Sequence, residues 1–277
     1  METFTSKNDF AILEEKVKWA WKQTLLIHKK APGTRIASSL SPIGILICLY
    51  YGKILNFNSK MPFWEERDRF IISKAHGSIA MYPLLADLGF FDRKELENVC
   101  QEGTFLGSIP DPIIPGYETV NGSLGHGLGV GSGIALALKK KCQKNKVFVL
   151  VGDGELYEGS NWEAIMFAAH HRIDNLILIV DHNQACMLGT CKQVIDYHPL
   201  SEKFATFNWD VQEVDGHKLK ELYAVLLKYK NLEEGKPKVI IAHTVKGKGV
   251  PKLEESPLSH IVSLKPEEVD NLIQGDR

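Results

Sequence analysis

The chain has 277 residues, of which 44% are hydrophobic and 24% are charged, and its formal net charge at pH 7 is −1. This length and composition are ordinary for a globular chain with one large α/β domain or two small ones. The balanced charge argues against a nucleic-acid-binding surface. The first residues lack the apolar core of a signal peptide, and the most apolar runs are too short to span a membrane, so we expect a cytoplasmic protein with no membrane contact. The five cysteines are scattered without a CxxC pair, which is typical of reduced thiols rather than of a metal site.

Two helices are expected near the N-terminus. Residues 8–30 place apolar side chains on one side of a helix, and the run His28-Lys29-Lys30 suits its C-terminus. A loop over residues 34–41 follows the stop signal Pro32-Gly33. Pro42 then begins an apolar helix that continues to about Leu55.

The next stretch alternates regular elements with glycine-rich loops. A strand from Phe70 to Ser73 leads into a loop with His76, a helix through about Leu88, and a short helix over 92–101. An irregular loop over 103–117 and a glycine-rich stretch over 121–133 precede a helix from Ile134 to Lys141. Glycines before a helix can present free N–H groups to an anion, although small residues also permit close helix packing.

Residues 146–183 form the β-α-β unit around which we interpret the rest. A buried strand, Val147–Val151, ends in Gly152-Asp153-Gly154, and a second strand, Leu176–Val180, ends in Asp181-His182-Asn183. Ligands of open parallel sheets bind outside the carboxyl ends of strands, so Asp153 and Asn183 can reach one ion. Their oxygens suit Mg²⁺ or Ca²⁺, and the glycines would let a diphosphate approach the backbone. An ordinary turn in a β-α-β unit is the alternative interpretation.

The remaining residues extend the same pattern. We expect a loop over 184–193, a helix over 218–230 and a strand from Lys238 to His243. Residues 266–277 form a short acidic helix or fray. No repeat or linker divides the chain, so residues 1–277 are expected to form one α/β domain, a mostly parallel sheet with helices on both faces.

Several runs resemble one enzyme family. GDGELYEG, the following NWEA and Asn183 resemble the GDG…N signature of thiamine-diphosphate enzymes, and within that group the transketolase family. RDRF with the later His76-Gly77, the stretch around Leu124-Gly125 and the run TVKGKGV at 244–250 are also similar to it. The resemblance covers roughly residues 10–262. It implies the thiamine-diphosphate-binding fold, in its diphosphate-binding domain, with thiamine diphosphate and Mg²⁺ (or Ca²⁺) as cofactors.

The resemblance also implies roles for single residues. The metal would be held by Asp153, Asn183 and the backbone carbonyl of Ala185. The residues near the cofactor would be His76, Gly122, Leu124, His126, Gly152, Gly154, Glu155, Asn183 and His260. The catalytic residues would be His76, His260 and Glu158, which matches the family's interface glutamate. His126 replaces the usual glutamine, and Ile261 replaces the glycine that usually follows His260.

Two further departures concern the substrate. The family's Gly-His pair is Thr34-Arg35 here, and Ser108 stands where a histidine is usual. Arg35 and Ser108 are therefore candidate substrate contacts, and the planar guanidinium suits a carboxylate or phosphate. A 2-oxo acid could then replace the usual ketose phosphate as the donor. Alternatively, Arg35 faces solvent and a partner supplies these contacts.

Full-length transketolases also contain a pyrimidine-binding domain and a C-terminal domain, and these are absent from this sequence. We expect them on a second subunit that supplies the activating glutamate, in an α2β2 heterotetramer that is active only when assembled. The expected reaction is the transfer of a two-carbon ketol or acyl unit to an acceptor, with chemistry supplied by the cofactor. Two alternatives remain: a 2-oxo acid decarboxylase or acyl-transferring subunit, and a non-catalytic paralogue that acts as a scaffold.

Overall fold

The structure, a computed structural model, describes residue 4 and residues 6–275. Its centre is a sheet of five parallel strands in the order β1-β2-β3-β7-β6. The strands are β1 (Arg69–Ile72), β2 (Val147–Gly152), β3 (Leu176–His182), β6 (Asp210–Asp215) and β7 (Lys238–His243). Every residue of β2 and β3 is buried, which explains their continuous apolar sequences. The predicted parallel sheet is confirmed.

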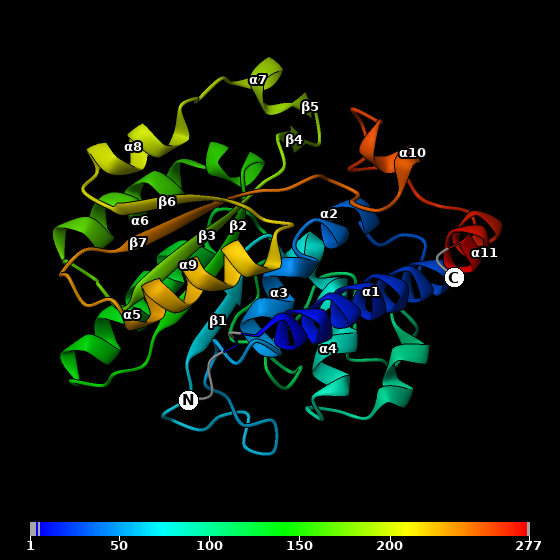
Figure 1. Ribbon diagram of the computed structural model, residues 1–277, viewed down its shortest axis with the longest axis horizontal. Coiled ribbons are helices and arrows are strands. Elements are labelled where there is room, and N and C mark those ends of the chain that lie inside the picture. Colours follow the sequence, from blue (N-terminus) through cyan, green and yellow to red (C-terminus); the bar gives the residue numbers. More distant parts are fainter. Residues whose placement is uncertain (1–3, 5, 276–277) are drawn as a thin grey trace.

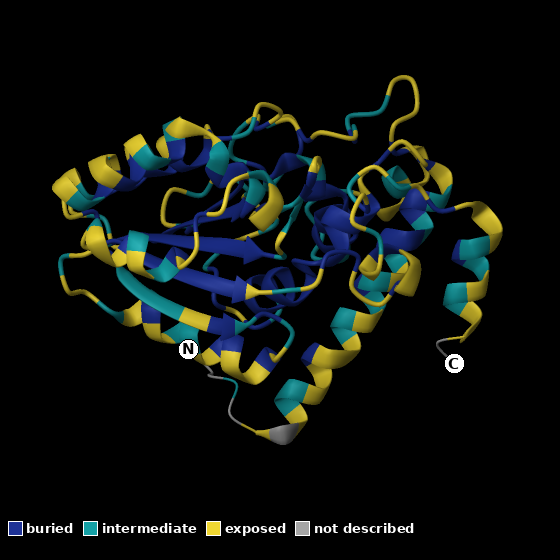
Figure 2. Ribbon diagram, turned by 90° about the horizontal axis from the view of Figure 1, so that it is seen from above, coloured by how far each residue is buried: buried dark blue, intermediate teal, exposed yellow. Residues whose placement is uncertain are grey.

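Helices cover both faces of this sheet (Figure 1). Successive strand residues point to opposite faces, so Leu150 and Ile177 join one hydrophobic cluster while Val149 and Leu178 join the other. The first cluster includes residues of α1 (Lys7–Lys30), α3 (Ile43–Tyr50) and α9 (Leu219–Asn231). The second includes residues of α5 (Gly127–Lys140), α6 (Gly159–His170) and α8 (Leu200–Thr206). Figure 2 shows the buried strands between helices that are exposed on their outer sides. The prediction of helices on both faces is therefore confirmed.

Short elements fill the connections. They are α2 (Ile36–Leu40), α4 (Met81–Asp87), α7 (Cys191–Val194), α10 (Pro251–Glu254), α11 (Pro266–Gly275), the 3-10 turns η1 (Ala75–Ala80), η2 (Arg93–Asn98) and η3 (Gly154–Tyr157), and the paired strands β4 (Ala185–Cys186) and β5 (Gly189–Thr190). Among the described residues, no helix combines the length and apolarity needed to cross a bilayer.

Three expected loops or boundaries were wrong. The predicted loop over 34–41 contains α2, and the predicted loop over 184–193 contains β4, β5 and α7. The helix expected to reach Leu55 ends at Tyr50, and Lys53 then takes a left-handed φ of 56°. These segments are short, so packing against the rest of the fold decides their structure more than local sequence pattern does.

The glycine-rich stretch was also assigned wrongly in part. Helix α5 begins at Gly127, whereas the sequence predicted a start at Ile134. A Cβ atom at Gly131 would lie 2.5 Å from Val149 Cγ2, and one at Gly127 would collide with Ser73. These glycines let α5 lie directly against the sheet, so close packing offsets their low helix propensity.

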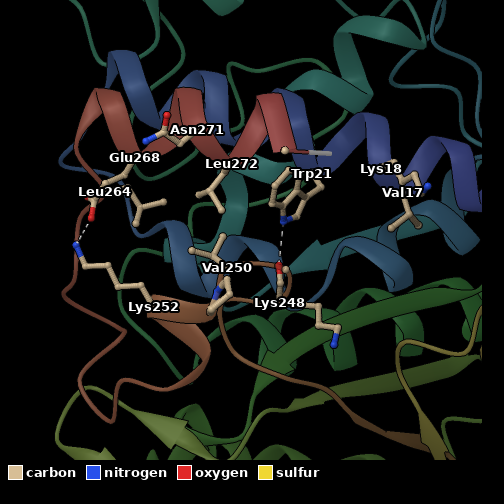
Figure 3. A pocket seen from close by; sticks show the side chains of 13 residues that line it. Val17, Lys18, Trp21, Lys248, Val250, Lys252, Leu264, Glu268, Asn271 and Leu272 are labelled. Carbon is tan, nitrogen blue, oxygen red and sulfur yellow. Dashed lines mark hydrogen bonds and ion pairs between the residues drawn. The ribbon is translucent and has the colours of Figure 1, made fainter. Parts of the chain in front are cut away.

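The C-terminal helix α11 lies beside α1 and leaves a groove of about 710 Å³ between them and the segment 248–252 (Figure 3). Trp21 Nε1 donates to the Lys248 carbonyl at 2.9 Å, and Lys252 pairs with Glu268 at 2.6 Å across the groove. The residues that line this groove do not include any candidate site residue. The groove is therefore separate from the cavity described below.

His28 joins α1 to the segment that precedes α11. Its Nδ1 lies 2.9 Å from Thr34 Oγ1, and its Nε2 accepts the Leu264 N–H at 3.1 Å. The Thr34 hydroxyl itself donates to the Ala31 carbonyl at 2.8 Å. Because Nε2 accepts a backbone N–H, the ring is neutral with its hydrogen on Nδ1. His28 therefore does not supply the positive charge that the sequence pattern suggested for the end of α1.

We expect the unfolding free energy of the wild-type chain to fall between about pH 7 and about pH 5 by about 2 kcal/mol more than that of His28→Gln. Burial lowers the pKa of His28 from 6.5 to about 4. The unfolded chain therefore takes up the proton first, and stability falls as the pH drops from 6.5 towards 4. Glutamine keeps an acceptor but does not titrate. Urea unfolding of both proteins at each pH tests this, and equal losses would contradict it.

Candidate active site

The carboxyl ends of β2 and β3 meet at one edge of the sheet. Gly152 pairs in register with Asp181, and Asp153 follows directly as the first residue after β2. Asp153 is 1% exposed, and its carboxylate accepts the N–H groups of Gly154, at 2.8 Å, and Gln184. These two bonds fix the carboxylate at the strand end, as the β-α-β pattern predicted.

Asn183 and Ala185 lie on the other side of this edge. Asn183 Nδ2 donates to Asp181 Oδ2 at 3.1 Å, and its Oδ1 accepts the Ala185 N–H at 3.2 Å. The Ala185 carbonyl accepts a hydrogen bond from Lys246 Nζ at 2.8 Å. Asp153, Asn183 and Ala185 from two strand ends thus line the same cavity, and carboxylate, amide and carbonyl oxygens are the kinds that a hard divalent cation prefers.

One cavity of about 370 Å³ collects most of the residues singled out in the sequence. Its lining includes Asp153, Asn183, Ala185, His76, His260, Gly122, Leu124, Gly152, Gly154, Glu155 and Glu158. Lys74 and Lys246 also line it. No role was assigned to these two lysines from sequence, although they stand inside the runs IISKAHG and TVKGKGV.

The wall of the cavity combines the lysines Lys74 and Lys246 and two histidines with the acidic residues Asp153, Glu155 and Glu158. Burial, followed by the charge of Lys74, lowers the pKa of Lys246 from 10.5 to about 8. Burial and then the Lys246 charge lower the pKa of His260 to about 4, and burial and then Lys74 hold the pKa of His76 well below 6.5. The two imidazole rings, with centroids 4.9 Å apart, are therefore neutral near pH 7. The Lys246 ammonium beside these neutral imidazoles suits an anionic ligand, whereas the Lys74 ammonium is paired with Asp181.

A buried ion pair supports the floor of the cavity. Lys74 Nζ pairs with Asp181 Oδ2, and both side chains are almost completely buried. Asp181 also accepts from Ser41 Oγ at 2.7 Å and from Thr244 Oγ1. Burial by itself would raise the pKa of Asp181, but the charge and hydrogen bond of Lys74, together with the two hydroxyls, hold that pKa below 3.8. The pair joins β3 to three other segments of the chain.

Glu155 connects the glycine-rich stretch to the strand ends. Its carboxylate accepts from Ser73 Oγ, from the Gly125 N–H at 2.9 Å and from the Gly152 N–H at 3.2 Å. Burial outweighs these bonds and raises the pKa of Glu155 above 4.5. The carboxylate therefore bonds to protein groups, which suits a role in positioning the loop around Gly125.

Four predicted site residues lie at or beyond the rim. Glu158 is exposed at the start of α6, with its side chain against Gly125, whose φ is +87°. His126, Arg35 and Ser108 are exposed and do not line the cavity. Arg35 is close enough to His260 to help lower the pKa of that ring. Arg35 and Glu158 therefore stand where a ligand or a second chain could contact them.

Residues 28–275 match the family described as "Transketolase, thiamine diphosphate binding domain". The chain is 37% identical over 260 residues to one subunit of the apulose-4-phosphate transketolase of Actinobacillus succinogenes, and the match covers 93% of each chain. It is 36% identical over 233 residues to the 6-deoxy-6-sulfo-D-fructose transketolase subunit SqwG of Clostridium sp. strain MSTE9, with 84% of each chain covered.

The crystal structure of transketolase from Campylobacter jejuni is similar to this fold, with a TM-score of 0.88 and 30% sequence identity. The match covers 96% of this chain but only 42% of the Campylobacter chain. The chain is thus comparable in length to the two subunit relatives and spans less than half of that transketolase.

Proposed function

This chain belongs to the transketolase thiamine-diphosphate-binding domain family, and from this premise we propose that it is the diphosphate- and metal-holding subunit of a two-subunit transketolase. The reaction is the transfer of a two-carbon ketol unit from a donor to an acceptor. The observation that supports this best is the single cavity of about 370 Å³ that unites Asp153, Asn183 and Ala185 with the two neutral histidines and two lysines.

The residues present fit both the metal and the diphosphate. Asp153, Asn183 and the Ala185 carbonyl offer hard oxygens suited to Mg²⁺ or Ca²⁺, of which we propose Mg²⁺ as the resident ion. Lys246 offsets part of the charge of a diphosphate in this partly desolvated site, whereas the charge of Lys74 is already paired with Asp181. Gly154 leaves no room for a side chain, because its Cβ would lie 2.8 Å from Cys186 Cβ. This glycine therefore lets the turn after β2 pack closely against the segment of Cys186, at the edge of the cavity.

The chain's own side chains then have distinct tasks. Thiamine diphosphate supplies the stabilised carbanion chemistry when it is bound. His76 and His260, neutral near pH 7, can accept a proton from a donor hydroxyl at a ring nitrogen and return it. Glu155 positions the loop around Gly125 beside them.

A second subunit is part of the proposal. Relatives that are named as single subunits of a transketolase imply a complementary subunit, and this chain spans 42% of the Campylobacter transketolase. We propose that the partner carries the pyrimidine-binding domain and its activating glutamate, and that Glu158 at the exposed rim faces it in an α2β2 heterotetramer in the cytoplasm. The scaffold and 2-oxo acid alternatives are not favoured, because the subunit relatives quoted above are transketolases and the oxygen donor set is intact.

Reconstitution tests the proposal. We expect the chain alone to transfer ketol units at less than about 1% of the rate of the two-subunit complex, because the acid that activates the aminopyrimidine is on the partner. The assay uses ketose phosphates, hydroxypyruvate and pyruvate as donors, with Mg²⁺ or with a chelator. Full activity of the chain alone, or activity of the complex that persists without divalent metal, would contradict the proposal. Faster transfer from pyruvate than from any ketose phosphate would favour the 2-oxo acid alternative.

A further inference from the structure

Three histidines gather behind the proposed cofactor site, and none of them takes part in the function proposed above. His182 ends β3 and is 3% exposed, His198 lies in the segment before α8, and His243 ends β7. The ring centroid of His182 lies 5.2 Å from that of His198 and 5.2 Å from that of His243. Three imidazoles from separate segments thus meet at one end of the sheet.

Carboxylates orient two of the three rings. His198 Nδ1 lies 2.9 Å from Asp196 Oδ1, and His243 Nε2 lies 2.7 Å from Glu213 Oε2. A carboxylate accepts but does not donate, so each of these nitrogens holds a hydrogen. In the neutral ring of His198, the lone pair is then on Nε2. Histidines that ligate metals are commonly held in this way by a carboxylate on the opposite nitrogen.

The lone pair of His198 faces His182. The two Nε2 atoms are 3.3 Å apart. His182 Nδ1 lies 3.3 Å from Asp153 Oδ2, and this buried nitrogen makes no well-formed hydrogen bond. A hydrogen on Nδ1, towards the carboxylate, leaves the lone pair of His182 on Nε2, whereas a hydrogen on Nε2 is donated to His198. The contact is favourable either with a hydrogen on one of the two Nε2 atoms or with a cation bound by both.

The spacing suits a transition-metal ion. Zn–N bonds of about 2.0–2.1 Å at a tetrahedral angle place the two nitrogens about 3.3 Å apart. We propose that Nε2 of His182 and Nε2 of His198 form a two-histidine site for a first-row transition-metal ion, best matched by Zn²⁺. Imidazole nitrogens favour Zn²⁺ over Mg²⁺, so this site is chemically distinct from the oxygen site at Asp153.

The site is open rather than closed. Among the described residues, no three histidine, cysteine, aspartate or glutamate side chains surround one point, so water completes the coordination shell. The bound ion would attach the segment 196–198 to β3 next to Asn183. Its affinity is expected to be micromolar, well below that of closed four-ligand zinc sites.

Metal titration of the purified chain without thiamine diphosphate tests the site, so the outcome does not depend on the proposed activity. Isothermal calorimetry under reducing conditions should show one Zn²⁺ bound per chain, with no comparable binding of Mg²⁺. His198→Ala should weaken this binding at least about tenfold, because one of two protein ligands is lost. His198 is exposed, so its replacement should leave the fold intact, and the thermal midpoint without metal checks this.

The matched control is the double variant His170→Ala/His171→Ala. This pair is exposed on and just after α6 and does not touch the cluster, so the control should bind Zn²⁺ as the wild type does. Unchanged Zn²⁺ affinity in His198→Ala would overturn the proposal. Absence of Zn²⁺ binding by the wild type would also overturn it, and would mean that a hydrogen bond joins the two Nε2 atoms.

Discussion

Replacing Asp153 by asparagine is expected to weaken Mg²⁺-dependent binding of thiamine diphosphate to the two-subunit complex by at least about 100-fold. Asp153 is the one carboxylate in the proposed donor set, since Asn183 and Ala185 offer only neutral oxygens. Asparagine has almost the same shape but removes the negative charge. Calorimetric titration with the cofactor, in the presence of Mg²⁺ and then of a chelator, measures the loss.

The fold should survive this substitution. Asparagine Oδ1 can still accept the Gly154 N–H, and the loss of one acceptor for Gln184 costs about 1 kcal/mol. The matched control is Glu163→Gln, which makes the same change of charge at an exposed position of α6. Binding by Asp153→Asn within about threefold of the control would mean that Asp153 does not hold the metal.

The sheet and the position of the polar residues at its strand ends were the predictable parts of this protein. The short apolar runs of β2 and β3 are typical of buried strands, and parallel strands bring their carboxyl ends to one edge. Asp153 and Asn183 therefore had to lie near each other. Family motifs then located His76, Gly122 and His260, and all of these line the same cavity.

The ionic and histidine networks could not be predicted in the same way. A lysine in sequence is more often solvated than buried, and nothing local shows that Lys74 reaches Asp181, 107 residues away. The neutral state of His28 depends on the Leu264 N–H, which only the tertiary fold brings to it. The early start of α5 depends on glycines that fit against β2, and propensity alone argues against a helix there.

Lys74 and Asp181 form the buried pair for which we expect the largest effect on stability. Asp181 has further donors in Ser41, Thr244 and Asn183, whereas no other acceptor for Lys74 Nζ is found among the described residues. Substitution of Asp181 therefore leaves a buried ammonium without an acceptor, whereas substitution of Lys74 leaves a carboxylate that keeps three donors. A buried ammonium without an acceptor is more costly than a carboxylate that keeps its neutral donors.

Asp181→Asn is accordingly expected to lower the free energy of unfolding by about 3–5 kcal/mol, and Lys74→Met by about 1–2 kcal/mol. The double variant should be more stable than Asp181→Asn alone, because it no longer contains an unpaired buried charge. Urea unfolding of the wild type and the three variants at neutral pH gives the four unfolding free energies of this double-mutant cycle. Equal costs for the two single variants, or costs that simply add, would mean that the two side chains do not act as an ion pair. If the expected order is found, the charges that line the cavity are maintained by the fold itself before any ligand binds.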